Sequence, residues 1–159
     1  MSVFDELIFD RSAADVSRWN TLRKKGWQAM SDEERAEWMA TMKGSYNYTD
    51  MNRVELAVAY LADRLTDDGY PCYPKTNWFW GITDKPLPED WDRYYGNVRL
   101  VRETLPAVFP TTPVPITRAS KLNYEAANDL EKILADVNTL VNSMEYMWLY
   151  SNDIFCGEV

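Results

Sequence analysis

The sequence feature that most constrains the fold is an apolar repeat near the end of the chain. From Asn123, a favourable helix cap, large apolar residues recur at alternating intervals of three and four over three heptads. The repeat comprises Ala127, Leu130, Leu134, Val137, Val141, Met144 and Trp148, and it is widened by Ile133, Leu140 and Met147. A stripe of this width is more typical of a helix packed on several neighbours than of a free coiled coil. We therefore expect a long helix over 123–150 inside a helical bundle, and the alternative is an oligomer seam.

The prolines divide the rest of the chain. All eight lie between Pro71 and Pro115, and proline removes a backbone donor and fixes φ, so this middle must contain extended connections. We predict one mainly α domain over 1–159, built as a bundle of about five helices with a Pro- and aromatic-rich extended middle. Its parts are an N-terminal helical pair (1–45), a third helix (46–70), a Pro-rich connector containing the fourth helix (71–122) and the long C-terminal helix (123–150).

Local signals place the helix ends. Ser12 with Asp15 and Ser31 with Glu34 are capping-box pairs that begin the first two helices. Gly26 and Gly44 are expected to end those two helices. The third helix should begin at Thr49 or Asp50, with Val54, Val58, Leu61 and Leu65 on one face, and end before Gly69. The fourth should start near Pro88 and end before Pro106, and "TNWFWGIT" (76–83) favours a short strand or hairpin arm.

One helix opening is repeated along the chain. Asn47-Tyr48, followed by Asn52 and Glu55, matches Asn123-Tyr124, followed by Asn128 and Glu131, and a weaker match places Asp92 with Asn52 and Arg93 with Arg53. Polar side chains at these positions can satisfy free N–H groups or bridge to a neighbouring connector, and the arginines can hold a carboxylate or a carbonyl. We interpret Asn52, Arg53, Asp92, Arg93 and Asn128 as architectural residues, with convergence on ordinary helix-start chemistry as the alternative.

Composition argues against several classes of function. The net charge of −8 disfavours nucleic-acid binding, and no apolar run is long enough to cross a membrane. The start of the chain has no basic region typical of a secretory signal. Seven acids and one base follow Asn123, which indicates a solvated helix face or a docking surface for a basic partner. Cys72 and Cys156 fit neither a disulfide framework nor a metal site.

No catalytic constellation is recognisable. The chain has no histidine, no phosphate-binding loop and only six scattered glycines. Acid pairs such as Asp67-Asp68 lack any further catalytic signal. We expect no enzymatic activity, no cofactor and no metal.

Aromatic residues are concentrated in the middle of the chain, with eight between Tyr70 and Tyr95. They predict either the second half of the core or a binding surface. Trp78, Trp80 and Trp148 are the candidate interface residues among the tryptophans.

Long stretches of the chain resemble one protein family. They are "DRSAADVSRW", "KGWQAMSDEERAEWM", "MKGSYNYTDMNRVELAVAYLADRL", "FPTTPVPIT", "LNYEAANDLEKILADVNTLV" and "YSNDIFCGEV". These resemble uncharacterised phage and prophage tail-associated (minor structural) proteins of Gram-positive bacteria. The resemblance implies a virion structural or adaptor protein of the tail, baseplate or fibre attachment, made in the host bacterial cytoplasm, whose partners are other virion proteins or further copies of itself. The alternatives are a small acidic phage-encoded inhibitor of a host or defence protein, and a glycan-binding module that uses Trp78 and Trp80.

Overall fold

The computed structural model describes the backbone of residues 2–40, 42–117 and 121–155, and in the last range it describes side chains up to Met144. The described elements are helical, which agrees with the predicted helical bundle. In chain order they are η1 (Val3–Glu6), α1 (Ala13–Lys25), η2 (Trp27–Ala29), α2 (Asp32–Met39), α3 (Tyr48–Asp67), α4 (Pro88–Thr104) and α5 (Tyr124–Phe155).

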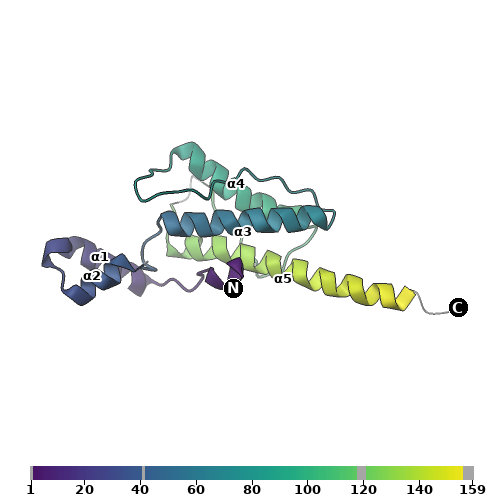
Figure 1. The fold of residues 1–159 in the computed structure, drawn as a ribbon, viewed down its shortest axis with the longest axis horizontal. Helices are drawn as coiled ribbons and strands as arrows, with labels where there is room; N and C mark the ends of the chain where they lie inside the picture. Colours follow the sequence, from purple (N-terminus) through teal and green to yellow (C-terminus); the bar gives the residue numbers. More distant parts are fainter. Residues whose placement is uncertain (1, 41, 118–120, 156–159) are drawn as a thin grey trace.

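Helices α3, α4 and α5 pack side by side as a three-helix bundle, and α1 and α2 form a pair beside one end of it (Figure 1). The predicted apolar faces form the bundle core. Leu130, Leu134 and Val137 of α5 are fully buried against Val54 and Leu61 of α3 and their neighbours. At least as far as Met144, the α5 stripe is therefore used inside its own bundle.

The predicted caps are largely confirmed. Ser12 and Ser31 form capping boxes with Asp15 and Glu34, and Gly26 ends α1 with a φ of 76°. Helix α3 begins slightly earlier than predicted, because Asn47 caps it and Asp50 completes its capping box. Helix α4 has the predicted bounds, and α5 continues five residues past the predicted end.

The prediction that Gly44 ends the second helix is wrong, because α2 ends at Met39 with Ala40 as its cap. Gly44 instead lies where the chain passes the backbone of α1. A Cβ atom at this glycine would stand 2.1 Å from the carbonyl oxygen of Asp15. The glycine is therefore required by close packing between two segments, which a local helix signal does not reveal.

No strand is assigned in residues 76–83. Residues 82–83 form a turn, and the backbone groups of Asn77 and Trp80 bond to helix side chains instead of to a partner strand. Three non-helical segments lie along the bundle, and we call them straps: the N-terminal strap (7–11), the middle strap (72–80) and the proline strap (109–117), which begins with a turn.

Each strap touches a different pair of helices. The N-terminal strap bonds to α3 and α5, and the middle strap bonds to α3 and α4. The proline strap accepts hydrogen bonds from Arg99 and Arg102 of α4, and its Thr112 donates one to Asp136 of α5. A non-helical strap thus lies along each of the three pairs of bundle helices.

Candidate functional site

The repeated helix opening forms two equivalent backbone clamps. The Asn52 side chain accepts from the N–H of Trp80 and donates to its carbonyl, both at 2.9 Å. The Asn128 side chain likewise accepts from the N–H of Arg11 at 3.0 Å and donates to the Arg11 carbonyl at 2.9 Å. Both asparagines are the fifth residue of their helix, so the sequence repeat corresponds to a repeated contact.

A glutamate three residues after each asparagine extends the clamp. Glu55 accepts from the N–H of Asn77 at 3.1 Å, and Glu131 accepts from the N–H of Ile8 at 2.6 Å. In both cases the strap residue held by the glutamate lies three positions before the one held by the asparagine. The two straps therefore run along their helices in the same register and antiparallel to them.

Helix α4 departs from this pattern. Asp92 is exposed, and the asparagine that clamps a strap from α4 is Asn97, which binds both the N–H and the carbonyl of Lys75. Arg93, which matches Arg53 in the sequence, holds a carboxylate and a carbonyl, as predicted for these arginines. Arg93 lies 2.7 Å from a carboxylate oxygen of Glu55 and donates to the carbonyl of Lys75, whereas Arg53 pairs with Glu131.

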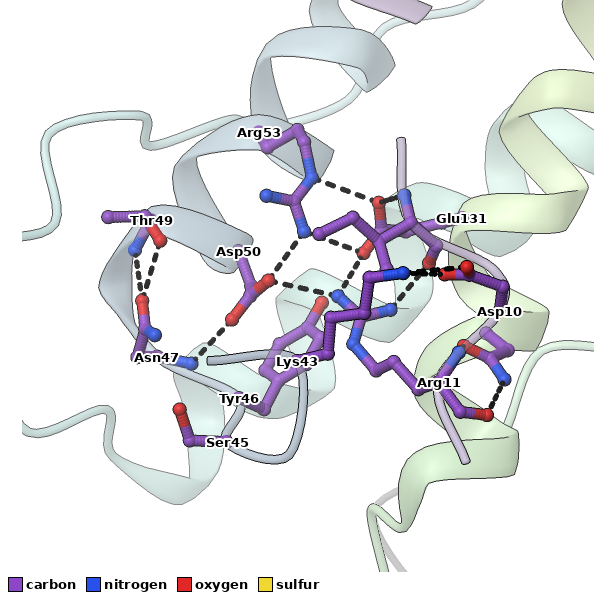
Figure 2. Close-up of polar contacts among 12 residues, drawn as sticks. Asp10, Arg11, Lys43, Ser45, Tyr46, Asn47, Thr49, Asp50, Arg53 and Glu131 are labelled. Atoms are coloured by element: carbon purple, nitrogen blue, oxygen red, sulfur yellow. Dashed lines mark hydrogen bonds and ion pairs between the residues drawn. The ribbon is translucent and has the colours of Figure 1, made fainter. Parts of the chain in front are cut away.

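Four charged side chains, three of them buried, meet where the N-terminal strap crosses the bundle (Figure 2). Arg11 lies 2.9 Å from Asp50 and 2.6 Å from Glu131, and Arg53 pairs with the same two carboxylates. Glu131 is fully buried, and Arg11 and Asp50 are nearly so. We call these four residues the charge cluster; its two positive and two negative charges balance.

Two hydrogen-bonded tyrosines lie next to the charge cluster. The Arg11 guanidinium lies 5.5 Å from the centre of the Tyr46 ring, and the Tyr46 and Tyr94 hydroxyls are hydrogen-bonded to each other. Burial, together with the nearby Glu131 carboxylate, raises the pKa of Tyr46 above its ordinary value, and burial also raises the pKa of Tyr94. Both hydroxyls therefore stay protonated at neutral pH, and the arrangement is suited to holding chain segments in place.

An aromatic cleft of about 470 Å³ opens next to the charge cluster, between the α1–α2 pair and the bundle. Trp19 and Trp38 stack nearly parallel on one wall, with ring centres 6.2 Å apart. Trp91 stands on the α4 side, stacked on Tyr95. The aromatic and sulfur-containing lining residues are Trp19, Trp38, Tyr46, Tyr48, Trp80, Trp91, Met39, Met42 and Met51.

The rim of the aromatic cleft is apolar and open to solvent. Met39 is 75% exposed and Ile82 is 83% exposed. Asp84 is the charged residue in the described lining, and one of its carboxylate oxygens accepts from the N–H of Gly81. The surface is therefore better suited to binding apolar side chains of a protein segment than to binding an anion.

Trp78 and Trp80, two of the three candidate tryptophans, have different environments. Trp80 is only 8% exposed, with the Arg93 guanidinium 6.0 Å from its ring centre. Trp78 is 39% exposed and packs on Phe79. The two rings do not form one exposed platform for a sugar, and the side chain of Trp148 lies outside the described residues.

Sequence reasoning missed Arg11, Asp50, Glu131 and the Trp19–Trp38 pair as parts of a site. The position of Glu131 in the sequence could have indicated a buried acid. It is four residues after Ala127 and three before Leu134, so it falls inside an apolar stripe. An acid at such a position needs a buried partner. Since Glu131 and Asp136 are both buried, the acidic C-terminal helix is less of a surface charge patch than its composition suggests.

The described residues contain no group of three or more acids or cysteines arranged to hold a metal ion. Within the same residues, no helix combines the length and the apolarity needed to cross a bilayer. The chain matches no protein-family model, no curated protein and no solved structure.

Proposed function

We propose that this chain is a phage virion structural or adaptor protein, associated with the tail, baseplate or fibre attachment, and that it acts through protein–protein contacts. The resemblance of its sequence to tail-associated proteins suggests the setting. The proposed mode of action, contact with another protein, rests on the aromatic cleft.

The chemistry of the aromatic cleft fits a segment of another protein. Aromatic residues and methionine are enriched in protein interfaces, and methionine adapts its shape to apolar partners. The cleft offers four tryptophans, two tyrosines and three methionines. Two or three apolar side chains of a partner would bury the exposed rim residues Met39 and Ile82.

The scaffold behind the aromatic cleft supports recognition by a preformed surface. Tyr46 and Asn47 line the cleft and also contact residues of the charge cluster. Trp80 lines it and is clamped by Asn52. Because these groups are already ordered, a partner pays little entropy to organise them.

The setting is tested by mass spectrometry of purified particles of the phage that encodes the chain. We expect the protein in intact, density-purified virions at a fixed ratio to a known tail component. Its presence in infected cells but not in particles would contradict the proposal.

The mode of action is tested with variants at the rim of the aromatic cleft. Met39→Asp and Ile82→Asp place charges on residues that are mostly exposed, so the fold should survive while incorporation into particles falls at least roughly tenfold. Val114→Asp, at a 69% exposed residue outside the cleft lining, is the matched control. Normal incorporation of both rim variants would rule the cleft out as the contact.

A further inference from the structure

Helix α5 is much longer than the bundle that contains its first half. It has 32 residues, against 20 in α3 and 17 in α4, or roughly 48 Å against 30 Å or less. Asn142 accepts a hydrogen bond from Arg64, in the last turn of α3. Figure 1 shows the remainder of α5, in yellow, running past the ends of both neighbouring helices.

The apolar stripe of α5 continues along this projecting part in the sequence. Val141 and Met144 pack in or against the core, and the same alternating spacing leads on to Trp148, Ser151 and Phe155. The second row, Ile133 and Leu140 in the bundle, leads on to Met147 and Ile154. Apart from Ser151, both rows of the stripe therefore stay apolar where α3 and α4 have ended.

The composition of the projecting part favours packing against another helix. Seven of the eleven residues 145–155 are apolar or aromatic. A helix of three turns without tertiary packing is marginal in water, and the apolar spacing in the sequence is typical of a helix that packs on another.

The spacing identifies another helix as the partner, because a seven-residue repeat is the signature of helices packed on each other. From Met144 to Phe155 the stripe positions carry no charge, and the acids Glu145 and Asp153 lie outside them. Identical segments can therefore face each other without placing like charges across the seam. Two acids and no base in 145–155 argue against an anionic lipid surface.

We infer that residues 145–155 of α5 are a self-association surface on which the same segment of a second copy of this chain packs. The contact continues the bundle core outward into a shared core between copies, and closed symmetry would cover the stripe on every copy. The inference is independent of the aromatic cleft, which lies beside the α1–α2 pair.

Light scattering coupled to size-exclusion chromatography tests this on the full chain, whose monomer mass is 18.6 kDa. At about 100 µM we expect a multiple of that mass, since association depends on protomer concentration. The double variant Met147→Asp/Trp148→Asp should elute at the monomer mass. Far-UV circular dichroism should still show the helical bundle, because the described core residues up to Met144 are unchanged.

Leu149→Asp is the matched control, because Leu149 is an apolar neighbour on the opposite helix face. It should keep the oligomer mass. A monomeric wild-type chain at about 100 µM, or an oligomer that survives the double variant, would overturn the inference. Equal dissociation by Leu149→Asp would overturn it as well, because the face of the helix would then not matter.

Discussion

The three-helix bundle and the α1–α2 pair are held together by different kinds of interaction. In the bundle, polar side chains bind backbone more than a hundred residues away, as Asn128 binds Arg11, and the Arg11–Glu131 pair is almost fully buried. In the α1–α2 pair, the contacts are local caps, the Trp19–Trp38 stack and exposed ion pairs such as Arg18–Glu37.

The difference indicates where stability resides. Exposed ion pairs contribute little, whereas a buried, hydrogen-bonded charge is costly to disturb. Helix α1 buries only Leu22 and α2 buries no residue, while α3 buries nine. We expect the bundle to unfold globally and the α1–α2 pair to open locally at lower cost.

The largest effect is expected from a charge in the bundle core. Leu134→Asp and Val137→Asp each place a carboxylate at a fully buried position, and each should cost about 4 kcal/mol or more. Thermal unfolding measures this, and Thr139→Asp at an exposed position of the same helix is the control. A melting shift below about 2 °C would refute the core assignment.

Glu131→Gln tests the charge cluster. The substitution keeps the shape of the side chain but leaves Arg11 and Arg53 with Asp50 as their common carboxylate, so we expect a loss of about 3–5 kcal/mol in urea unfolding. Glu103→Gln, at an exposed position, should change stability by less than about 0.5 kcal/mol. Similar effects of the two substitutions would show that the charge cluster does not anchor the bundle.

Asn52→Ala and Asn128→Ala test the equivalence of the two clamps. Each removes two hydrogen bonds to one strap residue, so each should cost about 1–3 kcal/mol. The double variant should show the sum of the two losses if the clamps act independently. A negligible effect of either single variant would mean that the repeated sequence does not have a repeated energetic role.

Glycine substitutions sharpen the comparison between the two regions. Gly44→Ala should disturb the packing of this segment on α1 by about 1–3 kcal/mol, since the added Cβ atom would collide with the Asp15 backbone. Gly96→Ala in α4 meets no atom within 4 Å and should stabilise the protein by about 0.5–1 kcal/mol. Hydrogen exchange should locate the first effect in α1 and α2, and faster exchange across the whole bundle would contradict this.

The smallest expected effect is the response of the two regions to acidic pH. Hydrogen bonds from Lys25 and Arg18 lower the pKa values of Glu34 and Glu37 below their ordinary value of 4.5. Their stabilisation is complete above that pH and is lost as the pH falls through the lowered values.

Burial raises the pKa of Glu55 in the bundle, so its contribution has the opposite sign: it is complete below pH 4.5 and is lost as the pH rises. Below about pH 4, amide exchange should therefore accelerate in residues 13–39 before residues 48–67. Simultaneous acceleration in both regions would contradict the division.

Much of the fold could be predicted from local chemistry. The caps at Ser12 and Ser31, the bounds of α4 and the buried stripe of α5 follow from short-range signals, because helix ends and apolar periodicity are local properties. The end of α2 could not be predicted in this way, since Gly44 is needed for contact with a segment about thirty residues earlier. The prediction of a strand at 76–83 was wrong for a similar reason. Side chains of α3 bond to the backbone groups of Asn77 and Trp80 that a partner strand would have bonded.

The sequence by itself determined which residues were available for the site, including a repeated Asn and Glu spacing on two helices and an acid inside each apolar stripe. Only the tertiary structure decided what these residues bind. Arg11 and Glu131 are 120 positions apart, and a pairing at that distance depends on how straps and helices pack. The aromatic cleft likewise exists only because α1 and α2 lie against one end of the bundle, since a cleft between distant segments has no local signature.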